Sequence, residues 1–427
     1  MTHRIPSTPH TPRSRRPHSR LVAVAAAAAL ALGVAGCAST ATKTGGTDSG
    51  GGGGGSTSNA NTATGGSVKV AVLSSKTGPL AAYTEEYIDG FKAGLDYATQ
   101  GTGKVDGKTV DVTYVDDQGK ADTAVAQFKD LVGKGYKIIA GTADSGIALQ
   151  LAPLAEQNKV LYVSGPAAAD AITGINKYTF RSGRQTYQDV KTAASTIGDP
   201  SGKKVVVFAQ DYAFGQANVA AVKAVLGAAG AKVSSVLVPT SATDFTPFAL
   251  KAKQKNPDLL FVAWAGDTTG AMWQALDQQG LFSGGPVVTG LANKASYGLY
   301  GPASAKIDFL SYYFPQAPDN DVNTAMVDAV KKAGSEADLF TPDGFVAAQM
   351  IVHAIHTSGG GEDVDKMISA LEGWTFDAPK GSETVRASDH AMLQPMFTAK
   401  LVKQGSTWVP QLENTVPADQ VAPPEAK

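Results

Sequence analysis

This 427-residue sequence has a single cysteine, almost no excess of charge of either sign and few recognisable catalytic motifs. Its one cysteine excludes an intramolecular disulfide and a thiolate metal cluster. The 37 Lys and Arg residues are balanced by 38 Asp and Glu residues, so the chain lacks the basic excess typical of nucleic-acid partners. A hydrophobic fraction of 43% excludes a wholly disordered chain.

Common enzyme motifs are also missing. The sequence has no G-x-x-x-x-G-K-[ST] phosphate loop and no G-x-S-x-G nucleophile elbow. Ser388, Asp389 and His390 are consecutive and would need a contorted turn to act as a triad. His353 and His356 lie three apart on an expected helix, where two partnered histidines are a simpler interpretation than a two-ligand metal site. We therefore expect a binding protein, not an enzyme, with no cofactor and no metal.

Residues 1–36 predict a lipoprotein signal peptide. Five arginines and no acidic residue precede an apolar stretch at 21–34. Such a stretch spans about 21 Å as a helix, short of the ~30 Å hydrocarbon core, so a cleaved signal is favoured over a permanent membrane span. Val34-Ala35-Gly36 before Cys37 resembles the bacterial lipoprotein box, which implies lipid attachment at Cys37. The alternative is an ordinary secretory signal with an incidental cysteine.

Residues 37–67 predict a lipid-anchored flexible linker. Ten glycines among Ser, Thr, Asn and Ala leave nothing that can form a core. Such a linker reaches about 30 Å, which would hold a folded body clear of the lipid while keeping it near a membrane partner.

From residue 68 onward, short apolar runs alternate with segments of helical periodicity, which predicts βαβ units. We expect an α/β fold of two doubly wound parallel-sheet lobes. The N-terminal lobe is assigned to 68–187 plus 316–376 and the C-terminal lobe to 188–315 plus 377–416. Residues 417–427 are expected to form a flexible tail.

Six short motifs occur in the order seen in one protein family: Thr77-Gly78-Pro79-Leu80-Ala81-Ala82-Tyr83, Asp116-Asp117-Gln118-Gly119, Pro153-Leu154-Ala155-Glu156, Phe180-Arg181, Asp244-Phe245-Thr246 and Leu371-Glu372-Gly373-Trp374-Thr375-Phe376-Asp377. Together they resemble the branched-chain amino acid (Leu/Ile/Val) binding proteins, the extracytoplasmic receptors of ABC importers. The resemblance covers about residues 68–412. It implies a type I periplasmic-binding fold with a three-crossover hinge and a ligand cleft between the lobes.

The resemblance also implies ligand contacts. Ser145 stands where the family presents a serine hydroxyl to a carboxylate, and a plain helix N-cap is the alternative. In the next loop alanine replaces the expected threonine, but the backbone amides of Ala167 and Ala168 can still hold an anion. The acidic partner of a ligand ammonium is expected near 290–293, where the sequence reads Gly-Leu-Ala-Asn. An amino-acid ligand is therefore disfavoured, unless Asp267 reaches the cleft.

Aromatic residues fall on loops expected to face the cleft, with core packing as the alternative for each: Tyr83, Tyr212, Phe214 and Trp264. Arg184 offers a bidentate fork to a carboxylate, and the alternative is a surface arginine paired with Asp189.

We expect a monomeric, non-enzymatic receptor on the outer face of the bacterial cell membrane that delivers a small ligand to an ABC permease. The expected ligand is a small carboxylate with an apolar or aromatic body. A branched-chain amino acid is the alternative ligand, and a sensor for a membrane receptor is the alternative function.

Overall fold

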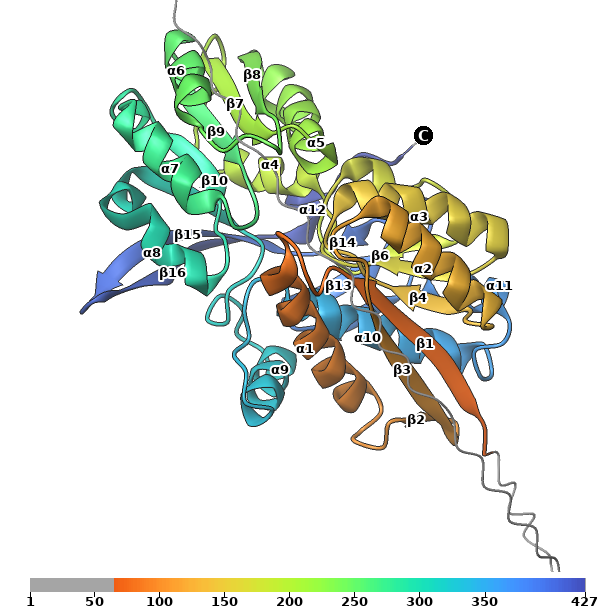
Figure 1. Cartoon of the computed structure of the whole chain (residues 1–427). Coiled ribbons are helices and arrows are strands. Elements are labelled where there is room, and N and C mark those ends of the chain that lie inside the picture. Colours follow the sequence, from red (N-terminus) through yellow and green to blue (C-terminus); the bar gives the residue numbers. More distant parts are fainter. Residues whose placement is uncertain (1–64, 427) are drawn as a thin grey trace, which may run out of the picture. The chain divides into compact units, whose positions relative to one another are not determined.

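The computed structural model describes residues 65–426, which form two large sheets with packed helices and one small sheet (Figure 1). The expectations for the signal peptide, for most of the linker and for Cys37 lie outside these residues. In spatial order, the first sheet contains β2 (Lys104–Val105), β3 (Lys108–Asp116), β1 (Ser67–Ser74), β4 (Ile138–Ala140), β5 (Leu161–Ser164) and β6 (Thr179–Arg181). All its pairings are parallel except that of the edge strand β2.

The second sheet is also mainly parallel. In spatial order it contains β16 (Thr407–Val416), β15 (Met396–Gln404), β11 (Ile307–Ser311), β10 (Val287–Gly290), β9 (Leu259–Ala263), β7 (Lys204–Gln210) and β8 (Lys232–Val238). The β15–β16 hairpin joins β11 by antiparallel pairing. A third, small sheet contains β12 (Thr375–Ala378), β13 (Gly381–Val385) and β14 (Met392–Leu393).

Helices accompany both large sheets. Those of the first lobe are α1 (Ala81–Ala98), α2 (Ala121–Gly133), α3 (Ser145–Asn158), α9 (Asp321–Lys332), α10 (Thr341–Thr357) and α11 (Val364–Leu371). Those of the second are α4 (Thr186–Ala194), α5 (Ala213–Val222), α6 (Thr246–Gln254), α7 (Thr269–Gln278) and α8 (Tyr297–Tyr300). No helix within 65–426 is both long enough and apolar enough to span a bilayer.

The strand β7 shows why these sheets are covered on both faces. Successive strand residues point to opposite faces, and the run from Val205 to Ala209 is apolar throughout. Val206 and Phe208 pack in one buried cluster with residues of α6 and α7. Val205 and Val207 pack in another with residues of α4 and α5. The predicted fold class of two doubly wound lobes is confirmed.

Glycines bring α1 and α10 unusually close together. A Cβ placed on Gly344 would lie 1.8 Å from the carbonyl oxygen of Tyr87, and one on Gly90 would lie 1.9 Å from that of Thr341. Only a residue without a side chain fits either position. This contact fixes α1, whose first turns carry Tyr83 and Glu86, against the helix that carries Asp343.

The chain crosses between the two lobes at three places. The first connection joins β6 to α4, the second joins β11 to α9, and the third joins β14 to β15. The third lies further along the chain than expected at 376/377, because Ala378, Val385 and Met392 pack in the core of the first lobe.

The tail beyond residue 416 is folded against the protein instead of being flexible. It contains α12 (Ala418–Val421), with Val421 fully buried. Arg386 donates hydrogen bonds to the carbonyls of Pro423 and Pro424. Its composition, rich in Pro and Ala, gave no sign of these contacts.

Candidate ligand site

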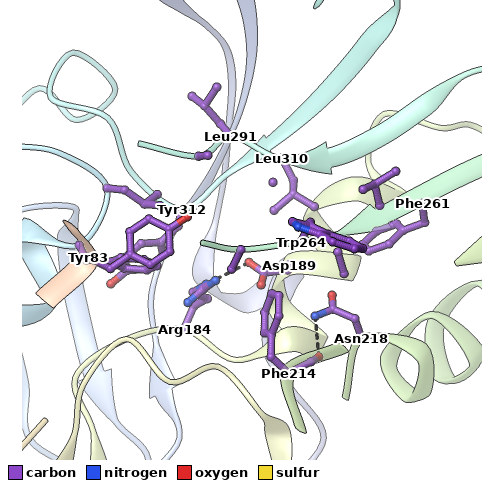
Figure 2. A pocket seen from close by; sticks show the side chains of 17 residues that line it. Tyr83, Arg184, Asp189, Phe214, Asn218, Phe261, Trp264, Leu291, Leu310 and Tyr312 are labelled. Carbon is purple, nitrogen blue, oxygen red and sulfur yellow. Dashed lines mark hydrogen bonds and ion pairs between the residues drawn. The ribbon is translucent and has the colours of Figure 1, made fainter. Parts of the chain in front are cut away.

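A cavity of about 70 Å³ lies where the parallel strands of the second lobe end, and residues of both lobes line it (Figure 2). A second cavity of about 40 Å³ adjoins it, and both are lined by Tyr83, Arg184, Phe214, Ala265 and Phe340. The carboxyl ends of parallel strands, together with the loops that follow them, provide most of the lining, as expected for open α/β sheets.

Arg184 is the cationic group of this site. It lies on the first connection, is 8% exposed and lines both cavities. Its Nε lies 3.3 Å from Asp189 Oδ1, and its Nη1 donates to the carbonyl oxygen of Pro166 at 3.0 Å. No hydrogen bond joins Nη2 to another residue of the described range. Arg184 is therefore paired with Asp189, as the alternative interpretation expected, but the pair is buried in the cavity wall and not on the surface.

Burial and the attraction between the two charges shift the pKa values of this ion pair in opposite directions. Burial lowers the pKa of Arg184, but the carboxylates of Asp189 and Asp343 outweigh it and raise the value. Burial also raises the pKa of Asp189, and Arg184 opposes that effect. The pair presents both a cation and a carboxylate to a ligand.

Aromatic rings form much of the wall. Tyr83 and Phe340 meet edge to face with centroids 5.0 Å apart. Burial raises the pKa of Tyr83 to about 12, so its hydroxyl remains protonated. Phe214 lines both cavities, and Tyr212 lines the smaller one.

Trp264 lines the larger cavity and also packs in the core. Its ring stacks on Phe208 at 5.7 Å and meets Phe245 edge to face at 5.3 Å. Its Nε1 donates to Thr268 Oγ1 at 3.0 Å. Trp264 therefore fits both interpretations, since its ring packs against the core and also lines the larger cavity.

Ser145 and Ala167 are not among the residues that line either cavity, whereas Ala168 lines the smaller one. The Ser145 hydroxyl accepts hydrogen bonds from the amides of Ala168 and Ala169, at 3.1 and 3.2 Å. The N-cap of α3 is Asp144, not Ser145. In this arrangement the serine oxygen accepts from two amides of the loop that follows β5.

Sequence reasoning missed Tyr312 and Phe340 and treated Asp189 only as a partner of Arg184. Tyr312 follows β11 directly, so the rule that ligands bind at strand carboxyl ends could have found it. Phe340 precedes α10 and gave no comparable signal. The segment 290–292 does line the cavity, whereas Asp267 is not among its lining residues.

Next to the cavity, a cluster of polar side chains joins the two lobes. Asn293, after β10, donates to Glu86 Oε1 of α1 at 3.0 Å. The amide of Lys294 donates to Asp338 Oδ2 at 2.8 Å. Burial and the nearby Asp338 raise the pKa of Glu86 to about 8, while the hydrogen bonds from Asn293 and Phe340 act in the opposite direction.

Within 65–426, no group of three or more His, Cys, Asp or Glu side chains is arranged to hold a metal ion. His353 stacks on Trp374 with centroids 4.1 Å apart, and its Nε2 lies 3.1 Å from the carbonyl oxygen of Ala370. His356 Nδ1 lies 2.9 Å from Asp106 Oδ1. Both histidines thus have local partners.

Comparison with known proteins agrees with this architecture. A family model described as periplasmic binding protein matches residues 67–406, and the chain belongs to that family. The Leu/Ile/Val-binding protein homolog 6 of Brucella abortus is 26% identical over 347 residues, covering 79% of this chain and 88% of the relative.

Two solved structures extend the comparison. An ABC-type branched-chain amino acid transporter protein from Rhodopseudomonas palustris is 34% identical, with a TM-score of 0.70, covering 84% of this chain and all of the other. An ABC-transporter solute-binding protein from R. palustris HaA2, in complex with p-hydroxybenzoic acid, is 25% identical, with a TM-score of 0.76, covering 82% and 97%. The chain is therefore an extracytoplasmic solute-binding protein of the ABC-transporter type, and proteins of this kind deliver small ligands to permeases and are not enzymes.

Proposed function

We propose that this receptor binds a small aromatic carboxylate between its lobes. The observation that carries the proposal is the position of Arg184 in a cavity wall that also contains six aromatic residues. Its Nη2 has donors to offer a carboxylate, and a charge-assisted bond to a buried guanidinium is among the stronger polar contacts in proteins. The similar R. palustris HaA2 protein is in complex with p-hydroxybenzoic acid, which supports this ligand class.

A branched-chain amino acid is the second candidate, because Asp189 also lines the cavity. A ligand ammonium would need a carboxylate partner there, since a desolvated cation without one is costly. The Brucella abortus relative is named a Leu/Ile/Val-binding protein homolog, and the 34% identical R. palustris structure is described as a branched-chain amino acid transporter, which supports this alternative.

A thermal-shift and calorimetry panel separates the two candidates. The ligands are benzoate, 4-hydroxybenzoate, leucine and valine, and a ligand at a hundred times its dissociation constant stabilises a fold by about 2.7 kcal/mol. We expect an aromatic acid to stabilise the protein and the amino acids to have no effect. Stabilisation by leucine or valine alone would refute the proposal.

Variants then test the roles of the ion pair. Arg184→Lys should weaken aromatic-acid binding roughly 10- to 100-fold, because the bidentate fork is lost. The matched control is Arg386→Lys, since Arg386 also pairs with an aspartate, Asp389, at 2.7 Å but does not line either cavity. Asp189→Asn should abolish amino-acid binding if Asp189 receives an ammonium, and should spare an aromatic acid.

We also propose that lipids on Cys37 anchor the receptor to the outer face of the cell membrane. Cys37→Ser should release the protein from the membrane fraction without changing its ligand affinity, because a long polar segment separates Cys37 from β1. Membrane fractionation checks the first effect and calorimetry the second. Unchanged membrane retention would contradict the anchor.

A further inference from the structure

The ring of Tyr312 is a meeting point of the three connections between the lobes. Tyr312 lies on the second connection and lines the ligand cavity. The guanidinium carbon of Arg184, on the first connection, lies 5.3 Å from the ring centroid. Lys380 Nζ lies 3.7 Å from the same centroid and donates to Gln394 Oε1 on the third connection.

Lys380 is an unusual residue to find in such a position. It occupies the turn between β12 and β13, and its side chain is fully buried. Its Nζ lies 3.8 Å from Glu383 Oε1, a loose ion pair. A buried ammonium is expensive, and burial lowers the pKa of Lys380 to about 8. The lysine therefore depends on its contact with the aromatic face as well as on Glu383.

Tyr312 is held at its other end too. Its hydroxyl donates a hydrogen bond to Asp343 Oδ1 of α10. Lys380 at the ring face and Asp343 at the hydroxyl leave the ring little freedom. The orientation that Tyr312 presents to the cavity is thus set by two buried groups that do not line the cavity themselves.

We propose that Lys380 is a positioning residue for the ligand site, holding the Tyr312 ring against the cavity and tying it to the third connection through Gln394. The inference rests on the proposed function only in that a ligand occupies the cavity beside Tyr312. Lys380 acts through Tyr312, not by touching the ligand.

A double-mutant cycle tests this chain of contacts. Lys380→Met should weaken binding of 4-hydroxybenzoate roughly tenfold in the wild-type background, the range of a desolvated cation–π contact. In a Tyr312→Leu background the same substitution should change affinity less than twofold, because the group through which it acts is gone. Equal effects in both backgrounds would overturn the proposal. Lys400→Met is the matched control, since Lys400 pairs with Glu413 at 2.8 Å on an exposed strand.

A second variant guards the test against misfolding of Lys380→Met. Lys380→Met leaves Glu383 buried without its cation, so the pair Lys380→Met with Glu383→Gln removes both charges together. This double variant should show the same loss of affinity as Lys380→Met. Wild-type affinity retained in a folded double variant would overturn the proposal.

The pH profile gives a readout that a purely structural role would not move. The charged groups that face Lys380 are Glu383 on β13, Asp343 on α10, Asp189 on α4 and Arg184 before it. Wild-type affinity for benzoate should fall above pH 8, as Lys380 loses its proton, and the fall should be smaller in Lys380→Met, where only Glu86 at the contact between the lobes titrates in this range. The same fall in both proteins would contradict the proposal.

A spectrum without ligand separates failure of this inference from failure of the proposed function. If no aromatic acid binds, the cycle is run with leucine, and if neither binds, ring-labelled tyrosine is observed by NMR. The Tyr312 ring signal, assigned by its loss in Tyr312→Phe, should shift in Lys380→Met and stay in place in Lys400→Met. An unmoved signal would refute the positioning role whatever the ligand.

Discussion

The hydrogen bond between Asn293 and Glu86 predicts how a remote substitution weakens ligand binding. Asn293 follows β10 in the second lobe, and Glu86 lies in α1 of the first. The asparagine amide has a partner on each side, because its Oδ1 accepts from Ser296 Oγ at 2.9 Å and its Nδ2 donates to Glu86. The bond exists only when the lobes are together, so it favours the arrangement that encloses the ligand.

Asn293→Ala removes the donor and leaves Glu86 Oε1 without it in a buried place. An unsatisfied buried acceptor costs about 1–3 kcal/mol, and about 1.4 kcal/mol is tenfold in an equilibrium constant. We therefore expect ligand affinity to fall roughly 5- to 150-fold. The ligand-free protein should keep its unfolding free energy, because opening of the lobes returns Glu86 to water.

Calorimetric titration and small-angle scattering measure this effect. The variant should need more ligand to reach the smaller radius of gyration that closure produces. Asn158→Ala is the matched control, since Asn158 donates only to the carbonyl oxygen of Leu154 within its own exposed helix end. If Asn293→Ala and Asn158→Ala bind ligand equally well, the lobes do not depend on this bond, and the reasoning fails.

Two further predictions concern stability. Gly344→Ala should lower the free energy of unfolding in urea by about 1–3 kcal/mol or more, because its Cβ would lie 1.8 Å from a carbonyl oxygen of α1. Gly133→Ala, whose Cβ would have nothing within 4 Å, should leave the free energy of unfolding unchanged. Equal effects of the two substitutions would contradict the packing argument. Burial raises the pKa of Glu383 to about 7 and of Asp343 to about 6. The folded chain thus binds more protons than the unfolded chain above about pH 4.5, so the unfolding free energy should fall as pH rises from 5 to 7, and a flat or rising profile would refute this.

The sequence was most informative where a local pattern determines a local structure. The continuous apolar run in β7 predicts a strand covered on both faces, and Pro342 at the first turn of α10 predicts where that helix begins. The third connection was placed too early because the pairings of β13 with β12 and with β14 leave no periodic signal in such short strands. The docked tail was missed for a similar reason, since its contacts with Arg386 are made by backbone carbonyls.

The site could be predicted only in part, because its chemistry depends on which partner each group meets. Expected loop and crossover positions indicate that Tyr83, Arg184, Phe214 and Trp264 lie near the cleft, and the structure brings these four to one cavity. Such positions cannot indicate that the Ser145 hydroxyl is engaged by two amides of a neighbouring loop. Such contacts join segments far apart in the chain and follow from the packed arrangement of α3 against β5.

The arrangement of Arg184 and Asp189 supports the proposed ligand class. Their Nε to Oδ1 contact uses one edge of the guanidinium and partly neutralises its charge. A simple carboxylate gains most if it binds the remaining donors, because the ion pair then stays intact and Asp189 keeps its counter-charge. A zwitterion would instead draw Asp189 toward its ammonium and weaken the same pair, at the cost of a buried carboxylate shared between two cations. The rings of Phe214 and Tyr312 line the same cavity and can stack on an aromatic ligand, which a branched aliphatic side chain cannot match. These two differences act in the same direction and favour an aromatic acid.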